Sequence, residues 1–92
     1  MDRTAFEDKL RADGFTEIAA RKLEAGPANG EHGHPFTARG LILDGAFTIT
    51  LEGTPRTYRS GEVFEVTAGR KHCEQVGPDG AHVLVGRKYT QA

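Results

Sequence analysis

The sequence has little of what marks secreted, membrane or nucleic-acid-binding proteins. Its one cysteine, Cys73, excludes a disulfide within the chain and fits a reducing compartment. Its apolar runs are far too short to span a membrane, and residues 1–10 carry charge where a signal peptide needs an apolar run. Neither sign of charge dominates, since 12 Lys and Arg face 13 Asp and Glu. We therefore expect a cytoplasmic protein with no membrane and no nucleic-acid partner.

The composition fits one small globular domain. The chain has 92 residues, of which 37% are hydrophobic and 27% are charged, so we expect a single domain over residues 1–92. A domain this short buries only a modest fraction of its surface, which favours a compact architecture and association with a second copy.

A short helix is predicted at about residues 5–13. Thr4–Glu7 has the pattern of a capping box. Phe6 and Leu10 are four positions apart and share one helical face. Gly14 then follows as a C-terminal cap.

The remainder, about residues 15–90, is punctuated as short strands. Residues 47–51 alternate apolar side chains with threonine, which is typical of a strand with one buried face. Asp44-Gly45 is a hairpin-turn dipeptide. Many short strands with evenly spaced turns predict an antiparallel sandwich or barrel. We expect strands at 15–23, 41–43, 47–51, 56–59, 62–67, 71–76 and 82–89, a loop at 25–30, and turns at 44–45, 52–55, 60–61, 68–69 and 77–80.

Three histidines are spaced as metal ligands could be. His32 and His34 are two positions apart, and on a strand this spacing points both imidazoles to the same face. His72 lies at the start of another predicted strand, and a meander could bring it to the same place. A divalent metal needs several such nitrogen ligands to converge. A His-x-His pair is also common on surfaces, so the spacing alone leaves a surface pair open.

Two segments around these histidines resemble the two sequence motifs of the RmlC-like cupin family. Residues 30–45 resemble the first motif, in which His-x-His is followed by a glutamate and a glycine. Residues 61–76 resemble the second motif, with Gly61, Gly69 and His72 at its glycine and histidine positions. The resemblance implies an all-β fold, an antiparallel double-stranded β-helix or jelly-roll barrel, to which the N-terminal helix is added.

The resemblance also implies a metal site. In the family the corresponding histidines bind one divalent metal ion inside the barrel mouth, so these roles fall on His32, His34 and His72, with Fe, Mn, Ni, Zn or Co as the ion. The family's glutamate ligand falls at Ala38, whose methyl group cannot bind metal. The remaining three-histidine set resembles that of cupin-type thiol and diketone dioxygenases.

Other residues could complete this site. Glu74 is two positions beyond His72 and should share its inward face, as a ligand or as the catalytic acid or base, the alternative being an exposed carboxylate. His82 could be a ligand, but we favour a surface histidine after a turn. Cys73 alternates away from His72 and is expected to pack outside the site.

Alternation predicts the surroundings of the site. We expect an inward face made by Phe36, Ala38, Gly40 and Ile42, and an apolar wall made by Phe47, Ile49 and Leu51. Three basic residues close in sequence to the ligands, Arg39, Arg70 and Lys71, either steer an anionic ligand or form a solvated rim.

Two functions follow from these features. The first is a metal-dependent enzyme, dioxygenase-like or isomerase-like, that acts on a small chelating acid, thiol or dicarbonyl. The second is a non-catalytic small-ligand-binding or sensory module, since one barrel hosts many functions. A metal-free structural domain is a third reading, against which the three histidines argue. We also expect a homodimer, because exposed sheet edges invite pairing and residues such as Val63 or Val83 could cover a partner surface.

Overall fold

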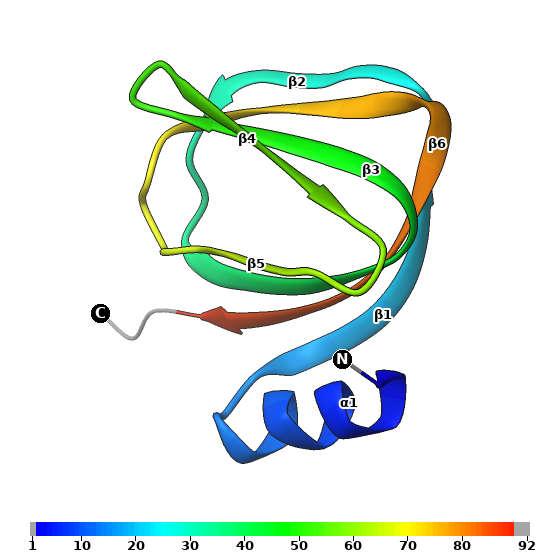
Figure 1. Ribbon diagram of the computed structural model, residues 1–92. Helices are drawn as coiled ribbons and strands as arrows, with labels where there is room; N and C mark the ends of the chain where they lie inside the picture. Colours follow the sequence, from blue (N-terminus) through cyan, green and yellow to red (C-terminus); the bar gives the residue numbers. More distant parts are fainter. Residues whose placement is uncertain (1, 90–92) are drawn as a thin grey trace.

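The described part of the chain folds into a barrel of antiparallel strands with one helix against its outside (Figure 1). The computed structural model describes residues 2–89, except for the side chains of residues 28–32. The elements are α1 (Arg3–Ala12), β1 (Thr16–Leu23), β2 (Gly26–His32), β3 (Phe36–Leu51), β4 (Thr54–Arg59), β5 (Val63–Val66) and β6 (His72–Tyr89). The predicted all-β jelly-roll fold with a short N-terminal helix is confirmed.

Two long strands, β3 and β6, form the frame of the barrel. They are antiparallel and pair on both sides of a corner, first from Phe36↔Tyr89 to Ile42↔Val83 and then from Phe47↔Val76 to Thr50↔Cys73. β1 and β2 both pair with β6, while β4 and β5 both pair with β3. The strand order β1-β6-β3-β4 therefore brings segments that are distant in sequence around one interior.

The corner corrects two predictions. The hairpin expected at Asp44-Gly45 is a bend within β3, and the turn expected at 77–80 is a bend within β6. Gly45 and Gly80 take φ values of +83° and +76°, and the register shifts on either side of Gly45. Such bulges bend a strand without reversing it, so the pairing of β3 with β6 continues past the corner.

The loop expected at 25–30 is also wrong. Residues 26–30 fall within β2, which pairs with β6 through Gly26↔Val76 and Pro27↔Gln75. The composition of this segment, which includes Pro27, is typical of a loop, and in the structure its pairing is irregular, with two register shifts. The turn expected at 52–55 is confirmed at Glu52-Gly53, whose positive φ values, 50° and 77°, are those of a tight hairpin turn, while Thr54 and Pro55 already belong to β4.

The helix begins two residues earlier than predicted. Asp2 is its N-cap, and the Asp2 carboxylate accepts a hydrogen bond of 3.1 Å from the backbone N–H of Ala5. The predicted apolar pair Phe6 and Leu10 is fully buried. This pair and Phe15 pack against the outer face of the barrel at Leu41 and Leu84.

A separate hydrophobic core lies inside the barrel. It contains Ile42, Phe47, Ile49, Phe64, Val66, Val76, Ala81 and Val83. Val83 is therefore buried and unable to cover a partner surface, whereas Val63 is exposed on β5. No helix within residues 2–89 has the length and apolar composition needed to cross a membrane.

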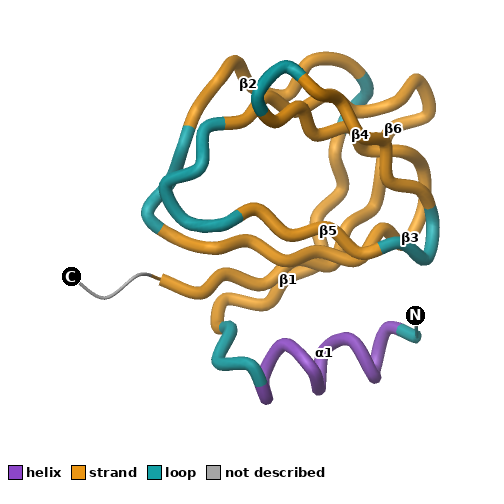
Figure 2. The backbone as a smooth tube through the Cα atoms, turned by 60° about the vertical axis from the view of Figure 1, so that its left-hand side comes forward, coloured by secondary structure: helices purple, strands orange, loops and turns teal. Residues whose placement is uncertain are grey.

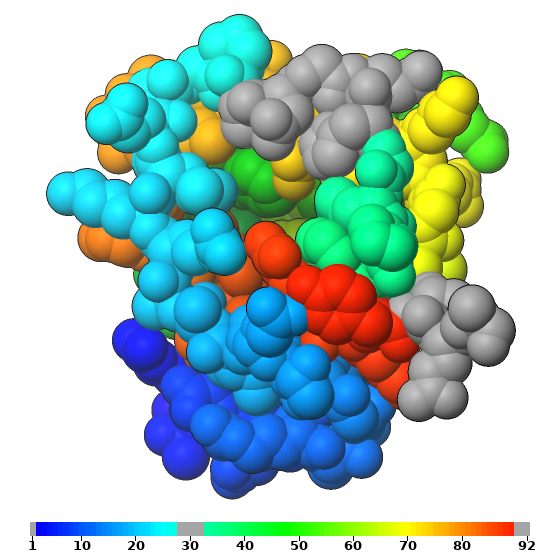
Figure 3. Space-filling model, turned by 180° about the vertical axis from the view of Figure 1, so that it is seen from behind, coloured from blue at the N-terminus to red at the C-terminus, as the bar shows by residue number. Residues whose placement is uncertain are grey.

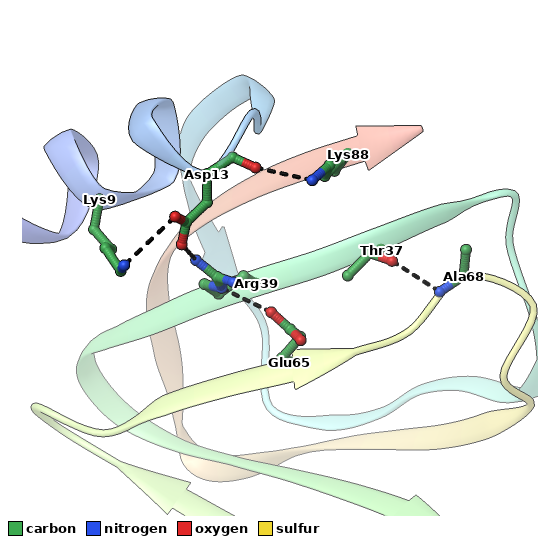
Figure 4. Close-up of polar contacts among 7 residues, drawn as sticks. All are labelled: Lys9, Asp13, Thr37, Arg39, Glu65, Ala68 and Lys88. Atoms are coloured by element: carbon green, nitrogen blue, oxygen red, sulfur yellow. Dashed lines mark hydrogen bonds and ion pairs between the residues drawn. The ribbon is translucent and has the colours of Figure 1, made fainter. Parts of the chain in front are cut away.

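A charged cluster fastens the end of α1 to the barrel (Figure 4). The Arg39 guanidinium donates to the Asp13 carboxylate and, at 2.7 Å, to Glu65 on β5. Lys88 donates to the backbone carbonyl of Asp13 at 3.0 Å. Arg39 also lies over the Phe15 ring, with 4.5 Å between the guanidinium carbon and the ring centroid. Neither alternative left open for Arg39, ligand steering or a solvated rim, describes its place, because its side chain packs between the helix end and the outside of the barrel.

This cluster predicts a pH-dependent contribution to stability. The hydrogen bond from Arg39 lowers the pKa of Asp13 below its ordinary value of 3.8. A lowered folded-state pKa means that the ionised carboxylate stabilises the fold above pH 3.8, and that this contribution is lost as the pH falls through the folded pKa. In urea unfolding, Asp13→Asn should therefore lower the midpoint at pH 7, with a smaller difference from wild type at pH 3. The exposed Asp8 of the same helix offers a control, and an equal pH dependence in Asp8→Asn and Asp13→Asn would contradict this assignment.

Candidate functional site

His72 is the first residue of β6, and it is more deeply buried than His34. Its side chain is 1% exposed, and its Nδ1 lies 2.9 Å from the carbonyl oxygen of Arg70. A carbonyl oxygen only accepts hydrogen bonds, so Nδ1 carries the proton and donates it. In the neutral imidazole the lone pair is then on Nε2, the form that can bind a metal.

His34 lies in the connection between β2 and β3 rather than on a strand. β2 ends at His32 and β3 begins at Phe36, so the prediction that His32 and His34 share a strand face is wrong. Pro35, the last residue of this connection, has no N–H to donate to a neighbouring strand. The His34 ring stacks on Phe36 with 4.0 Å between centroids, and its Nδ1 lies 3.2 Å from the Phe36 carbonyl oxygen.

The loop that carries His34 lies beside the loop that leads into His72 (Figure 2). The backbone N–H of Gly69 donates to the His34 carbonyl at 2.8 Å. A Cβ at Gly33 would lie 3.3 Å from the Gly69 carbonyl oxygen, a close approach that favours glycine. The rings of His34 and His72 consequently meet edge to face, with 5.0 Å between their centroids.

The third predicted ligand, His32, is placed only by its backbone. His32 is the Cα partner of His72 in the pairing of β2 with β6, and its side chain lies outside the described residues. Among the side chains that the structure describes, no three from His, Cys, Asp and Glu gather closely enough to hold a metal ion. The donor chemistry of His34 and His72 fits a metal site, and the ligand role of His32 stays a prediction.

Glu74 faces the interior beside His72. Its side chain is 19% exposed, and its Oε2 lies 3.9 Å from Nε2 of His72. It lines the barrel cavity, in agreement with the period-two alternation from His72. Its role as a ligand or as a catalytic acid or base stays a prediction.

His82 and Cys73 lie outside the site. His82 is 48% exposed, with its Nδ1 4.0 Å from the Asp44 carboxylate, and neither His82 nor the half-buried Cys73 lines the cavity.

A cavity of about 250 Å³ opens beside these residues. In Figure 3 it is the hollow between β1 and the start of β2, the start of β3, and the end of β6. Of the expected inward face and apolar wall, only Phe36, Ala38 and Phe47 line it. The cavity is lined by Arg21, Leu23, His34, Phe36, Ala38, Phe47, Phe64, Glu74, Val83, Val85 and Arg87. Ile42 and Ile49 lie in the core cluster, with Leu51 packed against it, and a Cβ at Gly40 would overlap the ring of Phe64.

Arg70 and Lys71 fit the solvated-rim alternative, and two other basic residues line the cavity. Arg70 is exposed and pairs with Glu52 at 3.2 Å, and Lys71 is exposed. Arg21 on β1 and Arg87 on β6 line the cavity instead. Alternation along β6 was the available signal for Arg87, since residue 87 shares its face with the apolar residues 83 and 85.

Comparison with known proteins places this geometry in a fold class. No family model matches the chain, and no curated protein matches it significantly. Among solved structures it is similar to a conserved protein of unknown function from Streptococcus pyogenes, with a TM-score of 0.70 and 24% identity over 82% of this chain. It is also similar to a cupin from Bacteroides fragilis, with a TM-score of 0.65 and 18% identity over 82% of this chain. A third similar structure is an RmlC-like cupin from Shewanella frigidimarina, with a TM-score of 0.64 and 16% identity over 80% of this chain.

These similarities show the fold. The barrel has the same jelly-roll fold as these solved cupin structures, the fold that the two sequence motifs implied. The chain spans just under two thirds of each of these three solved structures, with coverages of 65%, 66% and 66%.

Proposed function

We propose that this cupin domain binds one divalent metal ion through His32, His34 and His72, and that a small chelating ligand enters the cavity beside it. The observation that carries the proposal is the matched pair of His34 and His72. Both rings hold Nδ1 against a backbone carbonyl, and the rings are 5.0 Å apart. Metal-binding histidines are commonly fixed in this way, so that Nε2 is presented to the ion.

The ligand class follows from the charge of such a site. Three neutral imidazoles leave the double charge of Fe, Mn, Ni, Zn or Co uncompensated, which favours a bidentate anion. When bound, the ion would polarise a ligand oxygen or sulfur. Ala38 and the apolar wall leave room for a small body, such as that of an enolised dicarbonyl, a thiol acid or a hydroxy acid.

Glu74 favours an enzyme over a purely sensory module. Its carboxylate lies in the cavity, 3.9 Å from His72, where it could take a proton from a bound acid or enol. A dioxygenase-like or isomerase-like reaction would use such a group, whereas a ligand-binding or sensory module would not need it. The homodimer and the cytoplasmic location expected from the sequence stay proposals.

Calorimetry with acetylacetone, thioglycolate and lactate tests the ligand-binding proposal. The metal-loaded protein should bind at least one of them about tenfold or more tightly than the metal-free protein, because the ion supplies the charge that the anion needs. Oxygen uptake by the iron-loaded protein would support the dioxygenase reading, and Glu74→Gln should then slow turnover while binding is retained. Equal binding to metal-loaded and metal-free protein would contradict the proposal. Tight binding without turnover would favour the sensory module.

A further inference from the structure

Two cations lie in the cavity apart from the histidines. Arg21 and Arg87 both line it, together with one carboxylate, Glu74. Within the described part of the chain, no carboxylate forms an ion pair with either guanidinium. Arg21 is exposed at the rim, whereas Arg87 is only partly exposed. A partly buried cation that has no counter-ion among the described side chains is suited to pair with an anionic ligand.

Arg87 is held in place by an aromatic ring. Its guanidinium carbon lies 4.4 Å from the centroid of Phe36, a cation–π contact. Phe36 also stacks on His34, with 4.0 Å between the two centroids. The sum of these two distances, 8.4 Å, is an upper limit on the separation between the guanidinium carbon and the centre of the imidazole. A short ligand could therefore reach both groups.

Ala38 explains why the Arg87 charge is available. Ala38 and Arg87 are Cα partners in the pairing of β3 with β6, and both line the cavity. A carboxylate at position 38 would lie beside the guanidinium and compensate its charge. The methyl group leaves both the charge and the adjacent space to a ligand.

We propose that Arg87 binds a second carboxylate of the ligand, which makes the cavity selective for short dicarboxylates over monocarboxylates. The proposal rests on the proposed function, because the first carboxylate lies at the metal end beside His34 and His72. The cavity volume of about 250 Å³ is below the range of about 300–1,000 Å³ usual for ligand pockets. Its apolar walls, including Phe47 and Val85, suit the short carbon chain between the two charges.

The test compares succinate with butyrate, which has the same number of carbons and one carboxylate. Calorimetry is run on metal-loaded and metal-free wild type and on Arg87→Met, Arg87→Lys and Arg56→Met. Arg56 is the matched control, because its guanidinium also lies over an aromatic ring, 4.9 Å from the centroid of Tyr58, but does not line the cavity. Methionine keeps an unbranched apolar side chain and removes the charge.

Wild type and Arg56→Met should bind succinate about 10- to 100-fold more tightly than butyrate, as expected for a charge-assisted hydrogen-bonded pair. Arg87→Met should bring this ratio close to one, and Arg87→Lys should retain part of it. A ratio that is unchanged in Arg87→Met, or the absence of any succinate preference in wild type, would overturn the role of Arg87. Should the metal fail to tighten either ligand while Arg87→Met still removes the ratio, the proposed function falls and the Arg87 subsite stands.

Discussion

Replacing His72 with alanine is expected to weaken metal binding at least about 100-fold. Loss of a group that only orients a ligand typically costs 10- to 100-fold in affinity, and loss of the ligand itself should cost more. His72, a proposed ligand, is buried, is paired with His32 in the backbone, and lies edge to face with His34. Titration with Co or Zn, followed by calorimetry or by the visible spectrum of Co, measures the loss.

Two variants make this result specific to the site. His72→Gln keeps most of the side-chain volume, so it separates loss of a ligand from damage to the fold, which a thermal melt also reports. His82→Ala removes an exposed imidazole outside the cavity and should leave the affinity unchanged. Equal affinities in wild type and His72→Gln would show that His72 is not a ligand.

Gly45→Ala is expected to destabilise the fold by about 3 kcal/mol or more. The φ of +83° is strained for any residue with a side chain, at a cost of about 1–3 kcal/mol. A Cβ there would also overlap the carbonyl oxygen of Gly80 and lie 2.9 Å from Cα of Ala81. Because both contacts are backbone atoms in the paired strand, relief would require the corner of the barrel to open.

Gly53 is the control that separates the cost of backbone strain from the cost of the steric overlap at Gly45. Its φ of +77° is similar, but no atom lies within 4 Å of a Cβ built there. Gly53→Ala should therefore cost only the backbone strain, about 1 kcal/mol. Urea unfolding of both variants gives the comparison. Equal losses of unfolding free energy would mean that close packing at the corner does not explain the glycine at position 45.

The barrel was predictable where local pattern and tertiary structure agree. The inward positions of Phe47 and Ile49 follow from alternation, and the tight turn at Glu52-Gly53 follows from its composition. The corner at Gly45 was misjudged because a glycine with positive φ serves both a hairpin turn and a bulge. The difference depends on whether β6 continues alongside, and no local window of sequence contains that information.

The residues of the site were predictable where their direction follows from alternation along one strand. The inward direction of Glu74 follows from its spacing to His72, and Phe36 was correctly assigned to the cavity. The strand position predicted for His34 is wrong because β2 already ends at His32. Arg39 and Arg87 could not be told apart by composition. The register of β3 and β6 directs Arg39 toward the helix end and Arg87 into the cavity.

Elemental analysis of protein purified without an affinity tag tests the central claim most directly. The untagged protein should carry close to one divalent ion per chain, bound by the histidines at the mouth of the barrel. Protein that contains no such ion, and that binds none on titration with Fe, Mn, Ni, Zn and Co, would contradict the account.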